Sequence, residues 1–166
     1  NVYNAKRKFM DLQHVDLSKS LDANLIDKKL NKLKWITPYY PANPQKEIDL
    51  INNTIKILKK DTRKKMVITH YSFLSLILEQ DLNILNRWSL YHQNIYPIKK
   101  NKYVKYYKEF LNKNLKENDV EVVYIFKSKP NENLKIEHFK IHLDDICLKT
   151  EVVNELLSIH ELQKCS

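Results

Sequence analysis

The chain of 166 residues is 43% hydrophobic and 30% charged, contains no glycine and carries a formal net charge of +9. This length predicts one domain that folds without cross-links, and the lack of a long charge-free apolar run excludes a membrane span within these residues. The missing glycine excludes the standard dinucleotide fingerprint, P-loop, EF-hand loop and nucleophile elbow, since each needs a residue without a Cβ.

The basic charge reflects the composition of the chain rather than a nucleic-acid partner. Lys and Asn make up about a quarter of the residues, which is typical of an A/T-rich genome. Only Arg7, Arg63 and Arg87 carry the planar guanidinium that base and phosphate recognition favours. We therefore predict no nucleic-acid partner, and a Lys-rich surface suits anionic lipid head groups better.

The first part of the chain shows mixed signals. Residues 1–19 have no clean period and are predicted to be a linker or lead-in segment, which with the absent initiating Met suggests a piece of something longer. Residues 20–166 are predicted to form a single α/β domain. It begins with an amphipathic helix over 21–33, a strand over 34–37, and an irregular loop that ends at Pro44.

Helical and strand signals alternate after Pro44. Apolar residues from Ile48 to Leu58 recur at helical spacing, and residues 102–117 do the same. The clearest strands are residues 66–69 and 120–126, which are apolar on both faces. Weaker signals predict a buried helix over 73–78, a strand over 87–91, a helix over 139–147, and a last short strand or helix near Ile159, which residues 151–157 lead into.

This alternation predicts the fold class. Strands separated by helices of this length are typical of right-handed βαβ units, in which the strands are parallel. We expect an α/β domain of three layers with a mostly parallel sheet, Rossmann-like but without a glycine-rich loop.

Four side chains are candidates for ligand binding. His70 and Tyr71 follow the best strand, and ligands of parallel α/β sheets bind outside the carboxyl ends of the strands. Tyr39 and Tyr40 follow another predicted strand and would reach the same place if the two strands are neighbours. An imidazole can serve as acid or base near neutral pH, and tyrosine rings stack on sugars. The alternative is that His70 caps the strand and the tyrosines pack.

The sequence predicts no metal, cofactor or catalytic residue. His138 and His142 have the i, i+4 spacing of a zinc-binding pair on a helix, and Asp144 and Asp145 lie nearby. No Glu follows the first His, as it does in zinc hydrolases, so a solvated helix face explains the pair better. Nothing brings a Ser-His-Asp or Cys-His arrangement together.

Several runs resemble the end of bacterial multi-pass membrane glycosyltransferases of the dolichyl-phosphate-mannose mannosyltransferase type. The resemblance covers roughly residues 9–165, and its motifs are structural rather than catalytic. They are residues 32–38 (KLKWITP), Pro44 with Glu47-Ile48, residues 65–71 (KMVITHY), residues 101–103 (NKY) with residues 106–110 (YYKEF), and residues 120–125 (VEVVYI).

The resemblance implies a position rather than a reaction. The catalytic carboxylates of such families lie on a loop between early membrane helices, which this chain does not contain. The chain would be a non-catalytic soluble domain on the periplasmic face of a bacterial inner membrane, attached to a preceding membrane-embedded region and assisting the binding of a glycan or lipid-linked sugar. The alternatives are an independent module for a glycan or sugar phosphate, and a small α/β enzyme that uses His70.

The implied compartment also bears on the two cysteines. Cys147 and Cys165 both lie near the C-terminus, and an even count in a non-cytoplasmic domain favours a disulfide that ties down the terminal segment. Without that compartment, two free thiols would be an equal alternative. We expect the bridge.

Overall fold

The computed structural model describes residue 12, residues 14–84, residue 97 and residues 100–165. The chain divides into two compact units, Asn1–Leu58 and Lys59–Ser166. The predicted boundary between residues 19 and 20 stays a prediction, and the strand predicted over 87–91 lies outside the described residues.

The first unit has a small two-stranded sheet where a helix was expected. Strand β1 (Leu21–Asp22) pairs antiparallel with β2 (Lys34–Trp35). The helix predicted over 21–33 is therefore wrong. The side chain of Asp27 accepts a hydrogen bond from the Lys29 amide at 2.9 Å, which favours a short turn over a continuing helix. The described residues of this unit form 3₁₀ turns at Leu17–Lys19, Ala23–Leu25 and Lys28–Leu30.

The helix expected after Pro44 is confirmed as α1 (Pro44–Lys60). Proline suits the first helical position because its fixed φ is already helical and its missing N–H would be unpaired there. Glu47 in the first turn is fully buried, and one carboxylate oxygen accepts from Trp35 Nε1 at 3.1 Å and Thr37 Oγ1 at 2.8 Å. These bonds fix the chain after β2 to the start of α1.

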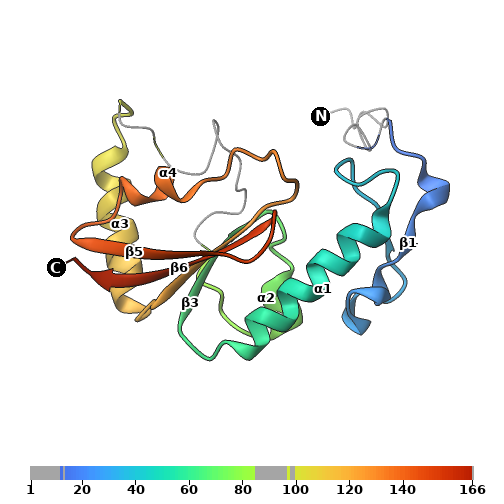
Figure 1. Cartoon of the computed structure of the whole chain (residues 1–166), viewed down its shortest axis with the longest axis horizontal. Coiled ribbons are helices and arrows are strands. Elements are labelled where there is room, and N and C mark those ends of the chain that lie inside the picture. Colours follow the sequence, from blue (N-terminus) through green and yellow to red (C-terminus); the bar gives the residue numbers. More distant parts are fainter. Residues whose placement is uncertain (1–11, 13, 85–96, 98–99, 166) are drawn as a thin grey trace, which may run out of the picture. The chain divides into compact units, whose positions relative to one another are not determined.

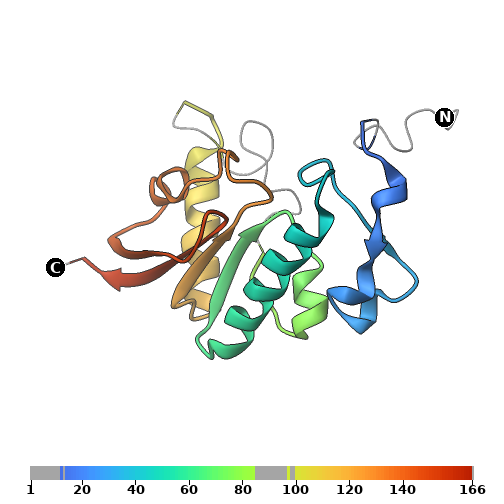
Figure 2. The ribbon, with the colours of Figure 1, turned by 45° about the vertical axis from the view of Figure 1, so that its right-hand side comes forward.

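The second unit holds a four-stranded open sheet in the order β3-β4-β6-β5. Its strands are β3 (Lys65–Thr69), β4 (Val122–Phe126), β5 (Ile146–Val152) and β6 (Leu157–Lys164). Strands β3 and β4 run parallel side by side, as Figure 2 shows, whereas β6 is antiparallel to both β4 and β5. The strands predicted over 66–69 and 120–126 are confirmed, and the fold is mixed α/β.

The prediction of a mostly parallel sheet is wrong, because the C-terminal part of this unit returns as a hairpin (Figure 1). The helix predicted over 139–147 is also wrong, since α4 (Ile136–Lys140) ends early and β5 begins at Ile146. The hairpin turn is fixed by Asn154, whose side-chain oxygen accepts from the amides of Leu156 and Leu157, each at 2.9 Å. The last element, expected to be short, is a strand of eight residues.

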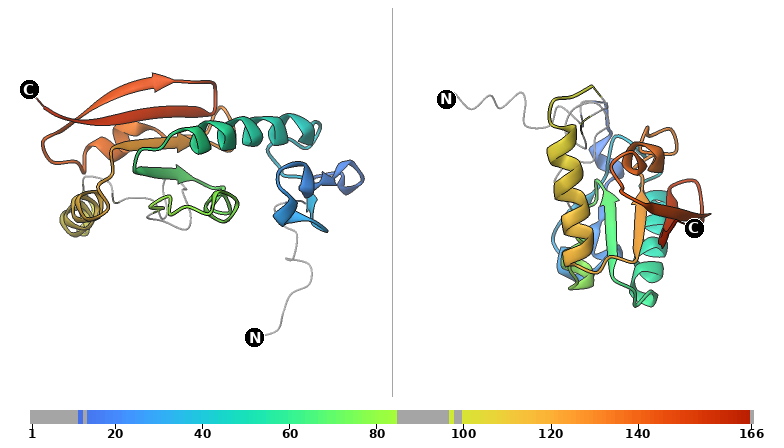
Figure 3. Two further views of the ribbon diagram at one scale, coloured as in Figure 1. Left: turned by 90° about the horizontal axis from the view of Figure 1, so that it is seen from below. Right: turned by 90° about the vertical axis from the view of Figure 1, so that its left-hand side faces the viewer.

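Helix α3 (Val104–Glu117) covers one face of β3 and β4 (Figure 3). The helices predicted over 102–117 and 73–78 are confirmed, the latter as α2 (Leu74–Leu78). Side chains from α3, α4, the two parallel strands and the loops next to them form the core on this face. They are Met66, Ile68, Leu111, Leu115, Val120, Val123, Ile125, Leu134 and Phe139.

A polar network around Asp61 joins the start of β3 to two neighbouring strands. The Asp61 carboxylate accepts from the Arg63 guanidinium at 2.8 Å and from the hydroxyl of Tyr124 on β4. Arg63 also donates to Glu161 on β6 at 2.8 Å. Burial opposes ionisation of Asp61, but the hydrogen bonds from Arg63 and Tyr124 outweigh it and lower its pKa to about 2.

We expect Tyr124→Phe to lower the free energy of unfolding by roughly 2 kcal/mol, because a buried hydrogen bond to a charged group is lost. Urea denaturation at neutral pH measures this. Tyr106→Phe is the matched control, since Tyr106 on α3 is 67% exposed and should change stability by less than about 0.5 kcal/mol. Equal stability of the two variants would contradict the role given to the network.

Candidate ligand-binding site

His70 lies directly after β3, and the structure brings it to a carboxylate that follows β4. Its Nε2 is 2.6 Å from Oε1 of Glu132. Both side chains are nearly buried, with 16% of His70 and 11% of Glu132 exposed. Because β3 and β4 are parallel, both groups sit at the carboxyl edge of the parallel pair, which is where α/β sheets bind ligands.

The other oxygen of Glu132 is held by Ser128. Oε2 accepts from the Ser128 amide at 2.6 Å and from its hydroxyl at 2.9 Å. Burial opposes ionisation of Glu132, but the hydrogen bonds from His70 and Ser128 outweigh it and lower its pKa. Glu132 is therefore a carboxylate at neutral pH, and it fixes the orientation of the imidazole.

This orientation leaves the second ring nitrogen of His70 for a ligand. Within the described part of the chain, the structure records no hydrogen bond to His70 Nδ1. A neutral imidazole that donates from Nε2 to a carboxylate presents Nδ1 as an acceptor, and a protonated one presents an N–H donor. Either form can bind a hydroxyl group, and an oriented imidazole is also suited to proton transfer.

Tyr71 does not share this role. It is only 5% exposed, and its ring packs at 4.9 Å from the ring of Phe126 and at 5.9 Å from that of Phe73. Tyr71 therefore packs in the core, which was the alternative to ligand binding, and its buried ring cannot stack on a sugar.

Tyr39 and Tyr40 belong to the other compact unit, so their approach to His70 stays a prediction. Tyr39 is 38% exposed. The Lys46 ammonium lies 6.0 Å from the centroid of the Tyr40 ring, at the limit of a cation–π contact. Tyr39 thus has ring surface available, whereas one face of Tyr40 is turned toward a cation.

The spacing of His138 and His142 does not place them on one helical face. Helix α4 ends at Lys140, so only His138 lies within it. His142 is fully buried and packs edge-on against Tyr107 at 4.9 Å. Among the residues that the structure describes, no group of three or more His, Cys, Asp or Glu side chains is arranged to hold a metal ion.

Neither Glu132 nor Ser128 was predicted from the sequence. Both lie in the segment that follows β4, on either side of Pro130. Ser128 is almost fully buried. A polar residue following a second buried strand, as His70 follows the first, was the available signal.

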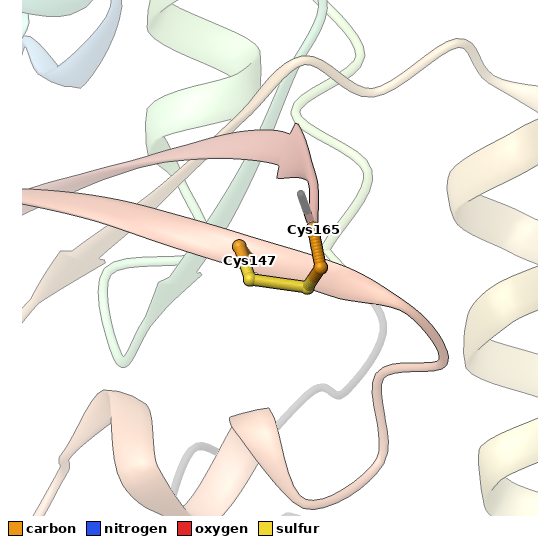
Figure 4. The surroundings of a disulfide bond; sticks show 2 residues. All are labelled: Cys147 and Cys165. Atoms are coloured by element: carbon orange, nitrogen blue, oxygen red, sulfur yellow. A yellow bond between two sulfur atoms is a disulfide. The ribbon is translucent and has the colours of Figure 1, made fainter.

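Cys147 and Cys165 are joined by a disulfide, with their Cα atoms 5.0 Å apart (Figure 4). It connects the start of β5 to the residue after β6, so it closes the open end of the C-terminal hairpin. The disulfide expected between these two cysteines is therefore confirmed.

Comparison with known proteins gives no relative for this chain. No protein-family model, no curated protein and no solved structure matches it. Within the described ranges, no helix has both the length and the apolar character needed to cross a bilayer.

Proposed function

We propose that this chain is a non-catalytic, carbohydrate-binding domain of a membrane glycosyltransferase-like protein. The observation that carries the proposal is the His70–Glu132 pair at the carboxyl edge of the two parallel strands. A fixed imidazole with one nitrogen left for a ligand can bind a sugar hydroxyl without any cofactor. The ligand would be a glycan or a lipid-linked sugar, as the resemblance in the sequence implies.

Titration of the chain with a mannose disaccharide and with a mannosyl-phosphoryl polyprenol in detergent micelles tests this function. We expect saturable NMR shift changes around His70 and Glu132. His70→Gln should weaken binding by about tenfold, because the hydrogen bond from the imidazole to the ligand and the contact between the imidazole and Glu132 are both lost.

His14→Gln is the matched control, since His14 is an exposed histidine in the other unit and should leave the affinity unchanged. Equal affinities of the two variants, or the absence of saturable shifts at residues 70 and 132, would overturn the proposed site.

The second candidate is a small α/β enzyme that uses His70. It is favoured by the contact of 2.6 Å between the imidazole and a carboxylate, the arrangement in which an oriented histidine acts as a general base. Sugar transfer or hydrolysis by the isolated chain that His70→Gln abolishes would establish this alternative. The non-catalytic proposal expects no turnover with lipid-linked donors.

The proposal places the chain on the periplasmic face of a bacterial inner membrane, attached to a preceding membrane-embedded region. It also retains, as a proposal, the three-layer, Rossmann-like arrangement predicted for residues 20–166. The gene upstream of the codon for Asn1 provides a direct test, because the proposal requires several long apolar segments there. An upstream sequence without them would favour the independent binding module instead.

A further inference from the structure

A pocket of about 270 Å³ lies in the second unit, and neither His70 nor Glu132 is among the residues that line it. It is formed by the start of α4, by Lys127 directly after β4, and by the β5–β6 hairpin, and the left view of Figure 3 shows α4 beneath that hairpin. A volume of this size is slightly below that of drug-sized ligand pockets and suits a small ligand.

The polar part of the pocket is built around His160 on β6. His160 is 2% exposed, and its Nδ1 lies 2.9 Å from Thr150 Oγ1 while its Nε2 lies 2.8 Å from Ser158 Oγ. Side chains alternate along a strand, so Ser158 and His160 lie on one face of β6, and Thr150 is the register partner of His160 on β5. The three groups therefore form one hydrogen-bonded row on the same face of the hairpin, with Ser158 and His160 on β6 and Thr150 on β5.

This row presents both a donor and an acceptor to the pocket. Burial lowers the pKa of His160 to about 4, so the ring is neutral at pH 7, with one N–H donor and one acceptor nitrogen. The hydroxyl next to the imidazole N–H accepts a hydrogen bond from it, so its own O–H remains to donate to a ligand. The hydroxyl next to the unprotonated nitrogen donates its O–H to the ring, so its lone pairs remain to accept from a ligand. A ligand hydroxyl, which both donates and accepts, complements such a pair.

Apart from Asn154, the remaining lining is apolar or charged, and its charges balance. Two lysines and two glutamates line the pocket, so their formal charges cancel and do not select a phosphate. The aliphatic side chains can bury the C–H groups of a sugar ring. The charged residues are Lys127, Lys135, Glu137 and Glu155, and the apolar ones are Ile136, Val152, Leu156 and Leu157.

We propose that this pocket is a second carbohydrate subsite, in which the Ser158 and Thr150 hydroxyls bind the hydroxyls of an uncharged sugar residue. The inference rests on the proposed function for glycan as the ligand class, but not on His70. It deepens that function by separating a subsite for a neutral sugar from the His70 edge.

NMR titration of the whole chain with methyl α-mannoside and methyl β-glucoside tests the subsite, with mannose 1-phosphate as the charged counterpart. We expect saturable shifts in β5 and β6, and no tighter binding of the phosphate. Ser158→Ala and Thr150→Val should each weaken binding by about tenfold, because each removes one ligand hydrogen bond. Ser75→Ala is the matched control, because its hydroxyl bonds only within the α2 region, to Ser72 O at 3.1 Å.

The outcomes separate this subsite from the site around His70. Shifts confined to His70 and Glu132, insensitive to Ser158→Ala, would overturn the subsite and leave the proposed function standing. Binding in β5 and β6 that His70→Gln does not affect supports the subsite even if the His70 site fails. Tighter binding of the phosphate in the pocket, or no saturable binding of either glycoside, overturns the subsite as stated.

Discussion

The free energy of unfolding should fall by about 3 kcal/mol through His160 alone as the pH drops from above 6.5 to below 4. Burial lowers the pKa of His160 from 6.5 to about 4, so the native state resists protonation of this ring in that interval. The unfolded state binds the proton near pH 6.5, so it holds more protons than the native state between the two values. Stability is therefore full above pH 6.5 and is lost as the pH falls, at about 1.4 kcal/mol for each unit of pKa difference.

The surroundings of His160 fix the size and the sign of this effect. The negative charge of Glu137 favours protonation and opposes the burial, which is the larger cause. His142, whose pKa burial also lowers, adds a loss of the same sign. Asp61 and Glu132, with lowered pKa values, lose their contributions only below their ordinary values of 3.8 and 4.5. Between pH 4.5 and 6.5, the loss of stability is thus governed by buried histidines.

Urea denaturation of the wild type and of His160→Gln at half-unit steps of pH measures the contribution. We expect the variant to be less stable at neutral pH, because Thr150 and Ser158 lose the imidazole, but to show a much flatter dependence between pH 6.5 and 4.5. The comparison of slopes does not depend on the absolute stability of the variant. The control His14→Gln should retain the wild-type slope. If His160→Gln also had the wild-type slope, the pH dependence could not be assigned to His160.

The elements predicted from the sequence are those whose pattern is local and strong. Residues 48–58 and 102–117 place apolar side chains at helical spacing over several turns, and these became α1 and α3. Residues 66–69 and 120–126 are apolar on both faces, and these became the central parallel strands. In each case the burial that decides the element is readable within the segment itself.

The helix predicted over 139–147 was wrong because the structure of that segment depends on residues distant from it in the sequence. Residues 139–147 have a helical pattern only in isolation, since Ile146 and Cys147 form a strand by pairing with Lys164 and Gln163. Local propensity does not encode this pairing. The helix predicted over 21–33 failed for a different reason. Asp27 has an extended backbone and its side chain caps the following 3₁₀ turn, so a continuous helix is interrupted there.

The candidate site shows the same limit. The position of His70 at a strand end could be predicted, because it needs only the end of one buried strand. Its partner Glu132 lies 62 residues away in the sequence and reaches it only because β3 and β4 are parallel neighbours. The burial of His160 likewise follows from the pairing of β6 with β4 and β5, so a list of histidines could not distinguish it.

Breaking the Cys147–Cys165 disulfide should lower the free energy of unfolding by about 3 kcal/mol, the value expected for a closed loop of this length. The cysteines are 18 residues apart, and the bridge closes the end of the hairpin at which β5 is an exposed edge strand. Once it is removed, the unfolded chain gains freedom and the last residues of β6 can fray. The double variant Cys147→Ser/Cys165→Ser, followed by urea denaturation, measures the loss.

Reduction of the wild type gives an independent measure of how much the disulfide contributes to the free energy of unfolding. Both cysteines are exposed, so a dithiol reductant should reach the bridge in the folded state and lower the stability to that of the double variant. The double variant itself should not respond to the reductant, which controls for other effects of the reagent. A wild type whose unfolding midpoint is unchanged by reduction would show that the bridge does not stabilise the hairpin. Two reactive thiols in protein purified from an oxidising compartment would contradict the bridge, and the proposed periplasmic location would lose its support from these cysteines.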